Sequence, residues 1–424
     1  MHSEKANGGT GNAALKNALL YMIIKDEMPL YSTEKEGMKK FLNLVAPHYN
    51  APGKNAITHF MEIKYSALRE IIKNKLKKAV SLTITTDIWT ETKTNRGFLG
   101  FTVHYWNGEK SVTYNIDTML LTKRRTADYI SEKFDSFLRT WGIEKERVTA
   151  VVTDGGANMK KAVKETFGAG KHMECFPHKL NLCINNVIHK KEKDSNLEGE
   201  EAIEGEDNFA GDIIEDPNVT EVKNNIKKLI DKVKTIVTFF KQSTSASDAL
   251  HEAQFDENFD YRLIQEVCTR WNSTYAMLNR FVMLVDKISS VLLRIRKAPE
   301  MLTRGELAQV QDLIGILRPA SVLTTDFSAA KYVTSSRVIP AIVDLREDIG
   351  GYECHTELGK KMKRFLIQEL DKQFAHCDDK PLLSIPTLLD PRFKRVYFSP
   401  LSCSRTLRLI NTHMFDRHDE QRLQ

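Results

Sequence analysis

The pattern of apolar and polar positions between residues 81 and 121 predicts three β-strands. Segment 81–87 alternates β-branched and polar side chains and ends at an aspartate, and segments 97–106 and 111–121 are also strand-like. The pair Asn107-Gly108 separates the second segment from the third, and this dipeptide favours a tight turn between antiparallel strands. We therefore expect the second and third strands to form a hairpin.

Helical spacing begins after the third strand. Residues 127–141 carry apolar side chains three and four positions apart, and the segment stops at Gly142. Residues 147–154 then form a short, nearly continuous apolar run, which is typical of a strand buried on both faces. A second helix is expected from about Ala157. A meander of three strands, a crossover helix and a buried strand follow the order of the ribonuclease-H-like fold, so the pattern predicts an α/β domain of that class.

Two aspartates stand at the ends of predicted strands. Asp87 closes the first strand and Asp154 closes the fourth, 67 positions later. Carboxylates at neighbouring strand ends suit two divalent cations about 3.5–4 Å apart, which activate the attacking oxygen and stabilise the leaving oxygen in phosphodiester cleavage. Magnesium in particular prefers carboxylate oxygens in octahedral geometry. The structural alternative is that one aspartate caps a helix and the other makes a turn.

Seven short motifs are spread over about 310 positions of the chain. They are Thr85-Thr-Asp-Ile-Trp-Thr90, Val152-Thr-Asp-Gly-Gly-Ala-Asn-Met159, Cys175-Phe-Pro-His-Lys-Leu-Asn-Leu182, Thr269-Arg-Trp-Asn-Ser-Thr-Tyr275, Leu317-Arg-Pro, Lys331-Tyr-Val-Thr-Ser-Ser-Arg-Val-Ile-Pro340 and Leu389-Asp-Pro-Arg-Phe-Lys394. In this order they resemble the successive signatures of hAT-superfamily transposases, and most closely those of their domesticated relatives, the zinc finger BED domain-containing proteins. The similarity covers nearly the whole chain.

The resemblance implies a fold class of α/β plus all-α: an incomplete ribonuclease-H-like domain, interrupted by a large helical insertion and preceded by an N-terminal helical module. A complete hAT active site also needs a glutamate in a Ser-x-x-Glu-Arg context, within a C-terminal segment that mediates dimerisation. The chain has no such context, and Glu347, Glu353 and Glu369 lie on predicted insertion helices. We therefore expect no transposase activity, with Asp87 and Asp154 as vestigial catalytic residues.

The metal requirements implied by the resemblance are equally limited. The BED zinc finger needs two cysteines and two histidines near the amino terminus, but no cysteine precedes Cys175. We expect the finger to be absent, and with it any structural zinc. No cofactor is required, and a residual Mg²⁺ or Mn²⁺ ion at Asp87 and Asp154 is the one metal that the resemblance leaves open.

Changes in composition along the sequence divide the chain into further parts. The expected parts are a disordered N-terminus at 1–12, a helical module at 13–78, the first part of the ribonuclease-H-like core at 79–190, an acidic disordered linker at 191–218, a helical insertion at 219–390 and a truncated or divergent C-terminal tail at 391–424. The linker carries eleven acidic residues and one lysine between residues 192 and 216. Such a run, low in aromatics and interrupted by glycines, is typical of a solvated excursion.

Charge and cysteine usage favour an intracellular nucleic-acid protein. The net charge of +6 combines −10 in the acidic run with +16 in the rest of the chain, a surplus that suits a polyphosphate partner. Solvated lysine faces account for such a surplus in many other proteins. The six cysteines are sparse and unpatterned, as in reduced cytosolic or nuclear proteins. No apolar run is long enough for a membrane span. We expect a nuclear protein that makes non-specific contacts with the DNA backbone.

The first candidate DNA contacts are lysines. Lys75, Lys77 and Lys78 end a long amphipathic helix predicted from residue 55, where they could touch the DNA backbone. The alternative is a solvated helix end whose cations complement the helix dipole. The resemblance adds His178, because the family's Cys-x-x-His motif, here Cys175 and His178, lies close to the active site and to DNA. A buried structural histidine is the alternative.

The resemblance also points to the pair Arg270-Trp271. In active relatives the matching tryptophan supports a flipped base, and stacking on an unpaired base is worth about 1–3 kcal/mol. Arginine can bind a phosphate or cover a neighbouring ring. The alternative is a tryptophan packed in a helical core, with the arginine stem lying beside it.

Three functions follow from these patterns. The preferred one is a domesticated, catalytically inactive, DNA-associated nuclear protein that regulates transcription and forms oligomers with itself or with related transposase-like proteins. The second is an active or fragmentary DNA transposase or nuclease that uses two divalent metals, with its third carboxylate from an unexpected glutamate or a partner chain. The third is a protein-interaction scaffold without DNA binding.

Overall fold

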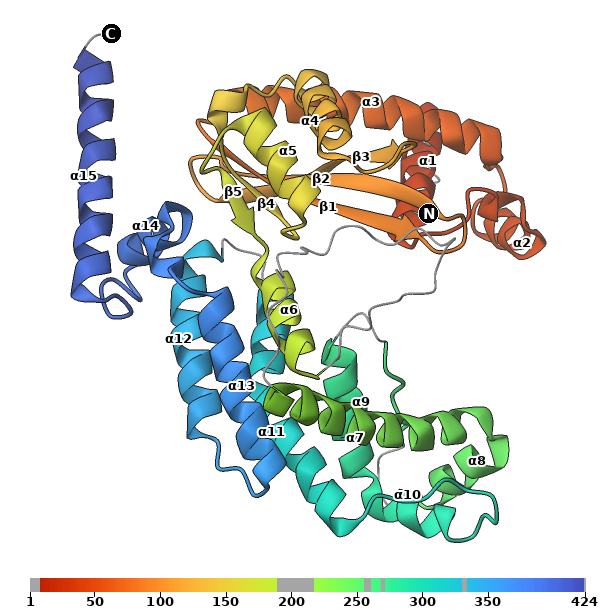
Figure 1. Ribbon diagram of the computed structural model, residues 1–424. Helices are drawn as coiled ribbons and strands as arrows, with labels where there is room; N and C mark the ends of the chain where they lie inside the picture. Colours follow the sequence, from red (N-terminus) through yellow and green to blue (C-terminus); the bar gives the residue numbers. More distant parts are fainter. Residues whose placement is uncertain (1–7, 189–216, 255–260, 268–270, 330–333, 423–424) are drawn as a thin grey trace. The chain divides into compact units, whose positions relative to one another are not determined.

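The computed structural model describes residues 8–188, 217–254, 261–267, 271–329 and 334–422 (Figure 1). The chain divides into two compact units, Met1–Val80 with Leu138–Glu144, and Ser81–Phe137 with Lys145–Gln424. The predicted acidic linker falls almost entirely outside the described residues. Among the helices that the structure describes, none is both long enough and apolar enough to span a membrane.

The first unit is helical. Its elements are α1 (Gly8–Lys25), η1 (Ser32–Glu34), α2 (Glu36–Val45) and α3 (Lys54–Lys78). A small core joins α1 to α3, and it contains Leu19, Leu20, Ile23 and Ile57. Glu34 fixes the start of α3, because its carboxylate accepts a hydrogen bond of 2.7 Å from the backbone N–H of Lys54, where the helix dipole favours negative charge.

Helix α1 begins earlier than the sequence indicates. The pattern predicts a disordered segment over residues 1–12 and a helix from residue 13, whereas α1 starts at Gly8. Glycine has a low helix propensity, but extending a helix that has already nucleated costs little per residue. Residues 1–7 lie outside the described part of the chain.

The second unit contains a five-stranded mixed sheet (Figure 1). Its strands are β1 (Leu82–Glu91), β2 (Arg96–Trp106), β3 (Ser111–Leu121), β4 (Val148–Thr153) and β5 (His172–Glu174), in the spatial order β3-β2-β1-β4-β5. The first three strands form the expected antiparallel meander. Strand β4 pairs with β1 in parallel, and β5 pairs with β4 in parallel. The sequence pattern misses β5, because three residues are too few to show a period.

One face of the sheet is apolar and packs on helices. Helix α4 (Ala127–Trp141) follows β3, and α5 (Ala157–Phe167) follows β4, with the short η2 (Lys145–Arg147) between α4 and β4. Phe101 of β2 stacks on Phe137 of α4 with ring centroids 4.0 Å apart, and Phe134 meets Phe167 of α5. These rings are buried, so aromatic packing holds both helices on this face.

The opposite face carries a polar ladder. His104 of β2 is hydrogen-bonded to Thr85 of β1 and to Thr113 of β3, each at 2.9 Å. Burial lowers the pKa of His104, so the imidazole is held neutral in this ladder. Asp87 lies two residues beyond Thr85 on β1 and therefore shares this face.

The remaining described elements are helical. They are α6 (Phe176–Ile188), α7 (Pro217–Gln242), α8 (Thr244–Glu252), α9 (Trp271–Met283), α10 (Val285–Leu292), α11 (Arg304–Ala329), α12 (Ser335–Gly351), α13 (Glu357–Gln373), η3 (Cys377–Asp379), α14 (Pro381–Leu389) and α15 (Pro400–Arg422). A single hydrophobic core runs through α6 to α14. The segment predicted as a divergent tail thus contains the helix α15.

Helix α6 packs with this helical part, although the sequence assigns it to the sheet domain by placing the division at residue 190. Phe176, the first residue of α6, lies with its ring centroid 4.4 Å from that of Phe327 and 5.6 Å from that of Phe374. Leu180 and Ile184 are fully buried in the same core. Helix α6 therefore leads directly from the edge of the sheet into the helical core.

Replacing Phe137 by alanine should lower the stability of the sheet domain by about 3–5 kcal/mol, because the truncation removes a fully buried ring and leaves a cavity. Hydrogen exchange of the β1 and β2 amides in increasing urea measures the change. Trp106→Ala is the control, since Trp106 lies on β2 but is 63% exposed, and should change stability by less than about 0.5 kcal/mol. Equal destabilisation in both variants would contradict the assigned role of the Phe101–Phe137 stack.

Candidate functional site

The parallel pairing of β1 with β4 brings Asp87 close to Asp154, which directly follows β4. The prediction that Asp87 closes the first strand is wrong, because β1 continues to Glu91. In the parallel register Ile84 lies opposite Val151, and Thr85 lies opposite Val152. Asp87 and Asp154 each follow two residues after that last pair. Because side chains two apart on a strand point to the same face, the two carboxylates lie level with each other on one face.

The pKa of Asp87 is also affected by Asp154 and by His178. Loss of solvent around its carboxyl group raises the pKa of Asp87, and the negative charge of Asp154 raises it further, while the charge of His178 and a hydrogen bond from the backbone of Ile88 oppose the rise. Two carboxylates that repel each other in this way would be stabilised by a cation between them. His178 lies close enough for its charge to lower the pKa of Asp87.

His178 lies in the first turn of α6 and completes a group of four side chains. A hydrogen bond with Cys175 raises the pKa of His178; partial desolvation of the ring opposes this, and the charges of Cys175, Asp87 and Asp154 add to the rise. The side chain of His178 remains exposed at the surface, in contrast to the buried structural histidine that was the alternative. The Cys-x-x-His motif and the aspartate pair thus occupy one site.

The backbone after β4 is shaped for a sharp turn into α5. Gly155 has a φ of +95°, a conformation that a side chain would strain. The backbone N–H of Gly155 donates to Thr153 Oγ1 at 3.2 Å, and that of Gly156 donates to Asp154 Oδ1 at 3.1 Å. Asp154 therefore also makes the turn that was its structural alternative, with one oxygen engaged by the backbone.

Among the described residues, the two aspartates do not by themselves complete a two-metal centre. No group of three or more His, Cys, Asp or Glu side chains suited to a metal ion occurs among the residues that the structure describes. Of the glutamates considered from the sequence, Glu369 accepts hydrogen bonds from Asn186 at 2.8 Å and from Gln373 at 2.9 Å. Two carboxylates leave a pair of hard cations short of oxygen ligands, so we derive no chemical step through a metal here.

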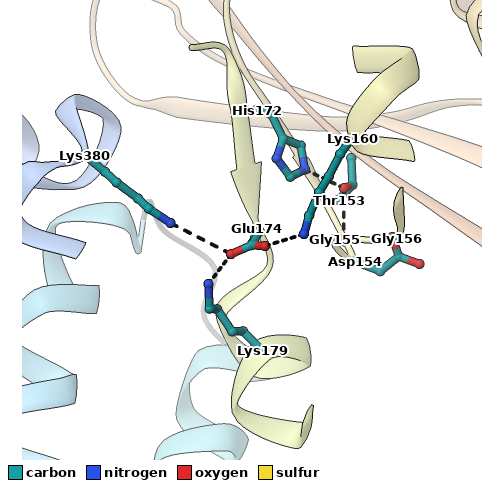
Figure 2. Close-up of polar contacts among 9 residues, drawn as sticks. All are labelled: Thr153, Asp154, Gly155, Gly156, Lys160, His172, Glu174, Lys179 and Lys380. Atoms are coloured by element: carbon teal, nitrogen blue, oxygen red, sulfur yellow. Dashed lines mark hydrogen bonds and ion pairs between the residues drawn. The ribbon is translucent and has the colours of Figure 1, made fainter. Parts of the chain in front are cut away.

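A cluster that sequence reasoning missed lies at the end of β5 (Figure 2). Glu174 accepts an ion-paired hydrogen bond from Lys160 Nζ at 2.9 Å and another from Lys179 Nζ, and Lys380 Nζ lies 3.9 Å from its Oε2 atom. Burial alone would raise the pKa of Glu174, but the hydrogen bonds and charges of Lys179 and Lys160 lower it to about 2. Glu174 is therefore ionised and held by lysines, which makes it a poor metal ligand.

Comparison with known proteins finds several to which this chain is similar. The family description "ZBED1 RNase-like helical domain" matches residues 173–316. Human zinc finger BED domain-containing protein 4 is 22% identical over 389 residues, which cover 89% of this chain and 30% of the relative. The putative AC transposase of Zea mays is 21% identical over 400 residues, covering 88% of this chain and 44% of the relative.

The chain is a hAT- and ZBED-like protein. A third relative, the putative transcriptional regulator tpeD of Talaromyces stipitatus, is 25% identical over 372 residues, which cover 82% of this chain and 40% of the relative. The hAT/ZBED-like chain thus spans less than half the length of these curated relatives. The family match begins at residue 173, close to the point where the chain leaves the sheet for the helical core.

The other predicted nucleic-acid contacts of the hAT/ZBED-like protein lie elsewhere. Trp271, the first residue of α9, is 1% exposed and meets Tyr275 at a centroid distance of 6.5 Å. The indole is therefore packed in the helical core, as the structural alternative to base stacking had it, and a base cannot reach it. Arg270 lies outside the described residues. Lys75, Lys77 and Lys78 are exposed at the C-terminal end of α3, in the first unit.

Removing the charge of Asp87 should change the pKa of His178. Because the pKa of His178 is raised in the folded state, its protonation stabilises the fold below the unfolded pKa of about 6.5, and this contribution is lost as pH rises through the folded value. Asp87→Asn removes one of the charges that favour the imidazolium, so we expect a lower pKa for His178 in a histidine NMR titration. His104 is the internal control, since burial alone lowers its pKa. An unchanged pKa of His178 would contradict the assigned site.

Proposed function

We propose that this hAT/ZBED-like protein associates with DNA in the nucleus as a regulator of transcription and does not cleave DNA. The proposal rests on the acidic side chains that β1, β4 and β5 bring together, Asp87, Asp154 and Glu174. This group retains an aspartate pair suited to the neighbourhood of a phosphodiester, whereas the glutamate beside it is neutralised by lysines. That the sheet domain is ribonuclease-H-like is part of the proposal, and the strand order β3-β2-β1-β4-β5 supports it.

Association with DNA is supported by charge and by relatives. Outside the acidic run the chain carries a surplus of +16, and such a surplus favours a polyphosphate through release of counterions. Among the relatives are proteins named as transposases and one named as a putative transcriptional regulator. Related transposase-like chains are also the partners with which we propose that the protein forms oligomers.

The proposal that the protein does not cleave DNA is supported by the carboxylates available to bind metal ions. A two-metal mechanism needs carboxylates that are free to bind cations, and Glu174 would have to release two lysine hydrogen bonds to take part. The hydrogen bond from Gly156 in the Asp154 turn also occupies part of that carboxylate. An active nuclease remains the competing function, because Asp87 and Asp154 are placed together as such an enzyme would need.

The protein should leave supercoiled plasmid DNA intact in the presence of Mg²⁺ or Mn²⁺, because its carboxylates do not complete a two-metal site. Agarose gel electrophoresis of plasmid incubated with the full chain measures nicking. Asp87→Asn and Asp154→Asn are run beside the unmodified protein to detect a contaminating nuclease, whose activity would persist in both variants. Metal-dependent nicking that disappears in either variant would establish the competing enzyme function instead.

DNA affinity should fall steeply with salt, and part of that slope should come from α3. Replacing Lys75, Lys77 and Lys78 together by alanine should reduce the slope of log affinity against log salt by up to about 0.9 for each phosphate that is no longer neutralised. Fluorescence anisotropy with a labelled duplex measures the slope. The control replaces Lys25, Lys39 and Lys40, three exposed lysines of the same unit, by alanine, and removes the same charge.

If both triple variants reduce the slope equally, the α3 lysines are not a DNA-binding site. If the unmodified protein shows no salt-dependent binding at low ionic strength, DNA association itself fails and the scaffold function takes its place.

A further inference from the structure

The lysines around Glu174 come from three separate parts of the second unit (Figure 2). Lys160 lies on α5, Lys179 lies on α6 and Lys380 immediately precedes α14. Their ammonium groups converge on a carboxylate whose side chain is 21% exposed. Because long cationic side chains lose conformational entropy when they are ordered, three lysines at one point need an anion to hold them together.

One carboxylate does not balance this cluster. Three lysines and Glu174 sum to a charge of +2, and counting Asp154, whose charge acts on the nearby His172, still leaves +1. Burial lowers the pKa of Lys380, and the charge of Lys179 lowers it further, as expected where cations crowd. His172 adds no charge, because burial and the charges of Lys160 and Lys380 lower its pKa, although Glu174 and Asp154 oppose this.

The geometry leaves one lysine without a close acceptor in Glu174. Lys160 takes one oxygen at 2.9 Å and Lys179 takes the other, whereas Lys380 remains 3.9 Å away, beyond hydrogen-bond distance. A phosphoryl group is larger than a carboxylate and has oxygens directed along tetrahedral axes, so it can reach ammonium groups that are spread more widely. Lysine binds such groups as a point charge.

The surrounding backbone also favours a phosphoryl group. The cluster adjoins the start of α5, whose helix dipole attracts negative charge. The backbone of Gly155 lies beside the cluster, since a Cβ atom built there would be in ordinary van der Waals contact with Glu174 Oε1 at 3.5 Å and with Lys160 Cε at 3.6 Å. The same turn carries Asp154, which places the cluster beside the aspartate pair.

We infer that Lys160, Lys179 and Lys380 form a binding site for a backbone phosphate of the nucleic acid, and that Glu174 is a built-in counter-ion which the phosphate displaces. The inference rests on the proposed association with DNA and names one place where the backbone is held. Glu174 keeps the lysines ordered in the free protein and competes with the phosphate for them. Its removal therefore strengthens binding, and removal of a lysine weakens binding.

The test measures duplex DNA binding to the full chain by fluorescence anisotropy at several salt concentrations. Glu174→Gln removes the competing charge at similar size, and we expect affinity to rise by about 10-fold. Glu165→Gln is the matched control on α5, since Glu165 is 42% exposed and pairs with Lys161 at 3.7 Å. It removes the same charge outside the cluster and should change affinity by less than about 3-fold.

A second pair of variants covers the case in which Glu174→Gln fails to fold. Lys380→Gln alters the most exposed lysine of the cluster, and Lys372→Gln alters an exposed lysine of α13. We expect Lys380→Gln to weaken DNA binding and to reduce the salt slope by about 0.9, the amount for one fewer neutralised phosphate, and Lys372→Gln to have a smaller effect on both. Equal effects of the two lysine variants, or of the two glutamate variants, overturn the inference.

Inorganic phosphate distinguishes the two sources of a phosphoryl group. Its binding to the unmodified protein and to Glu174→Gln is followed by NMR at constant ionic strength. If Glu174→Gln strengthens phosphate binding but leaves DNA affinity unchanged, the site takes a free phosphate and the assignment to the nucleic-acid backbone is wrong. If the unmodified protein binds no DNA at low salt, the proposed function fails. Salt-dependent binding with no difference between the matched variants refutes this inference alone.

Discussion

The parallel pairing of β1 with β4 is the constraint on which the rest of the site depends. It joins strands whose connection includes a hairpin and a helix, and its register sets Asp87 level with Asp154. A shift of one residue in either strand would turn one carboxylate to the opposite face. Because β5 then adds to β4 in parallel, the same pairing also fixes where Glu174 and the start of α6 lie.

This part of the sheet combines two opposite electrostatic environments. Around Asp87 and Asp154 negative charges repel each other, and they add to the rise in the pKa of His178 that its hydrogen bond with Cys175 causes. Around Glu174, at the end of the neighbouring strand, positive charge is in excess, and burial together with this charge lowers the pKa of Lys380. The two environments therefore lie side by side at neighbouring strands.

The first four strands and the hairpin could be predicted, because alternation, an Asn-Gly turn and a buried apolar run are local signals. Strand β5 could not, since three residues show no period and depend on β4 for their hydrogen bonds. Trp271 could not be assigned either, because a tryptophan in a helical pattern serves equally as a core residue or as a stacking platform. Its 1% exposure decides for the core.

The amino-acid sequence by itself determined the kind of elements, the candidate aspartates Asp87 and Asp154, and the resemblance to hAT- and ZBED-like proteins, because these depend on local patterns and on short motifs in a fixed order. Only the tertiary structure decided which charges meet. Lys380 stands 206 positions after Glu174, yet its ammonium group lies 3.9 Å from that carboxylate. No spacing rule links such residues, since they meet only after α6 has carried the chain from the sheet into the helical core and the later helices have packed against it.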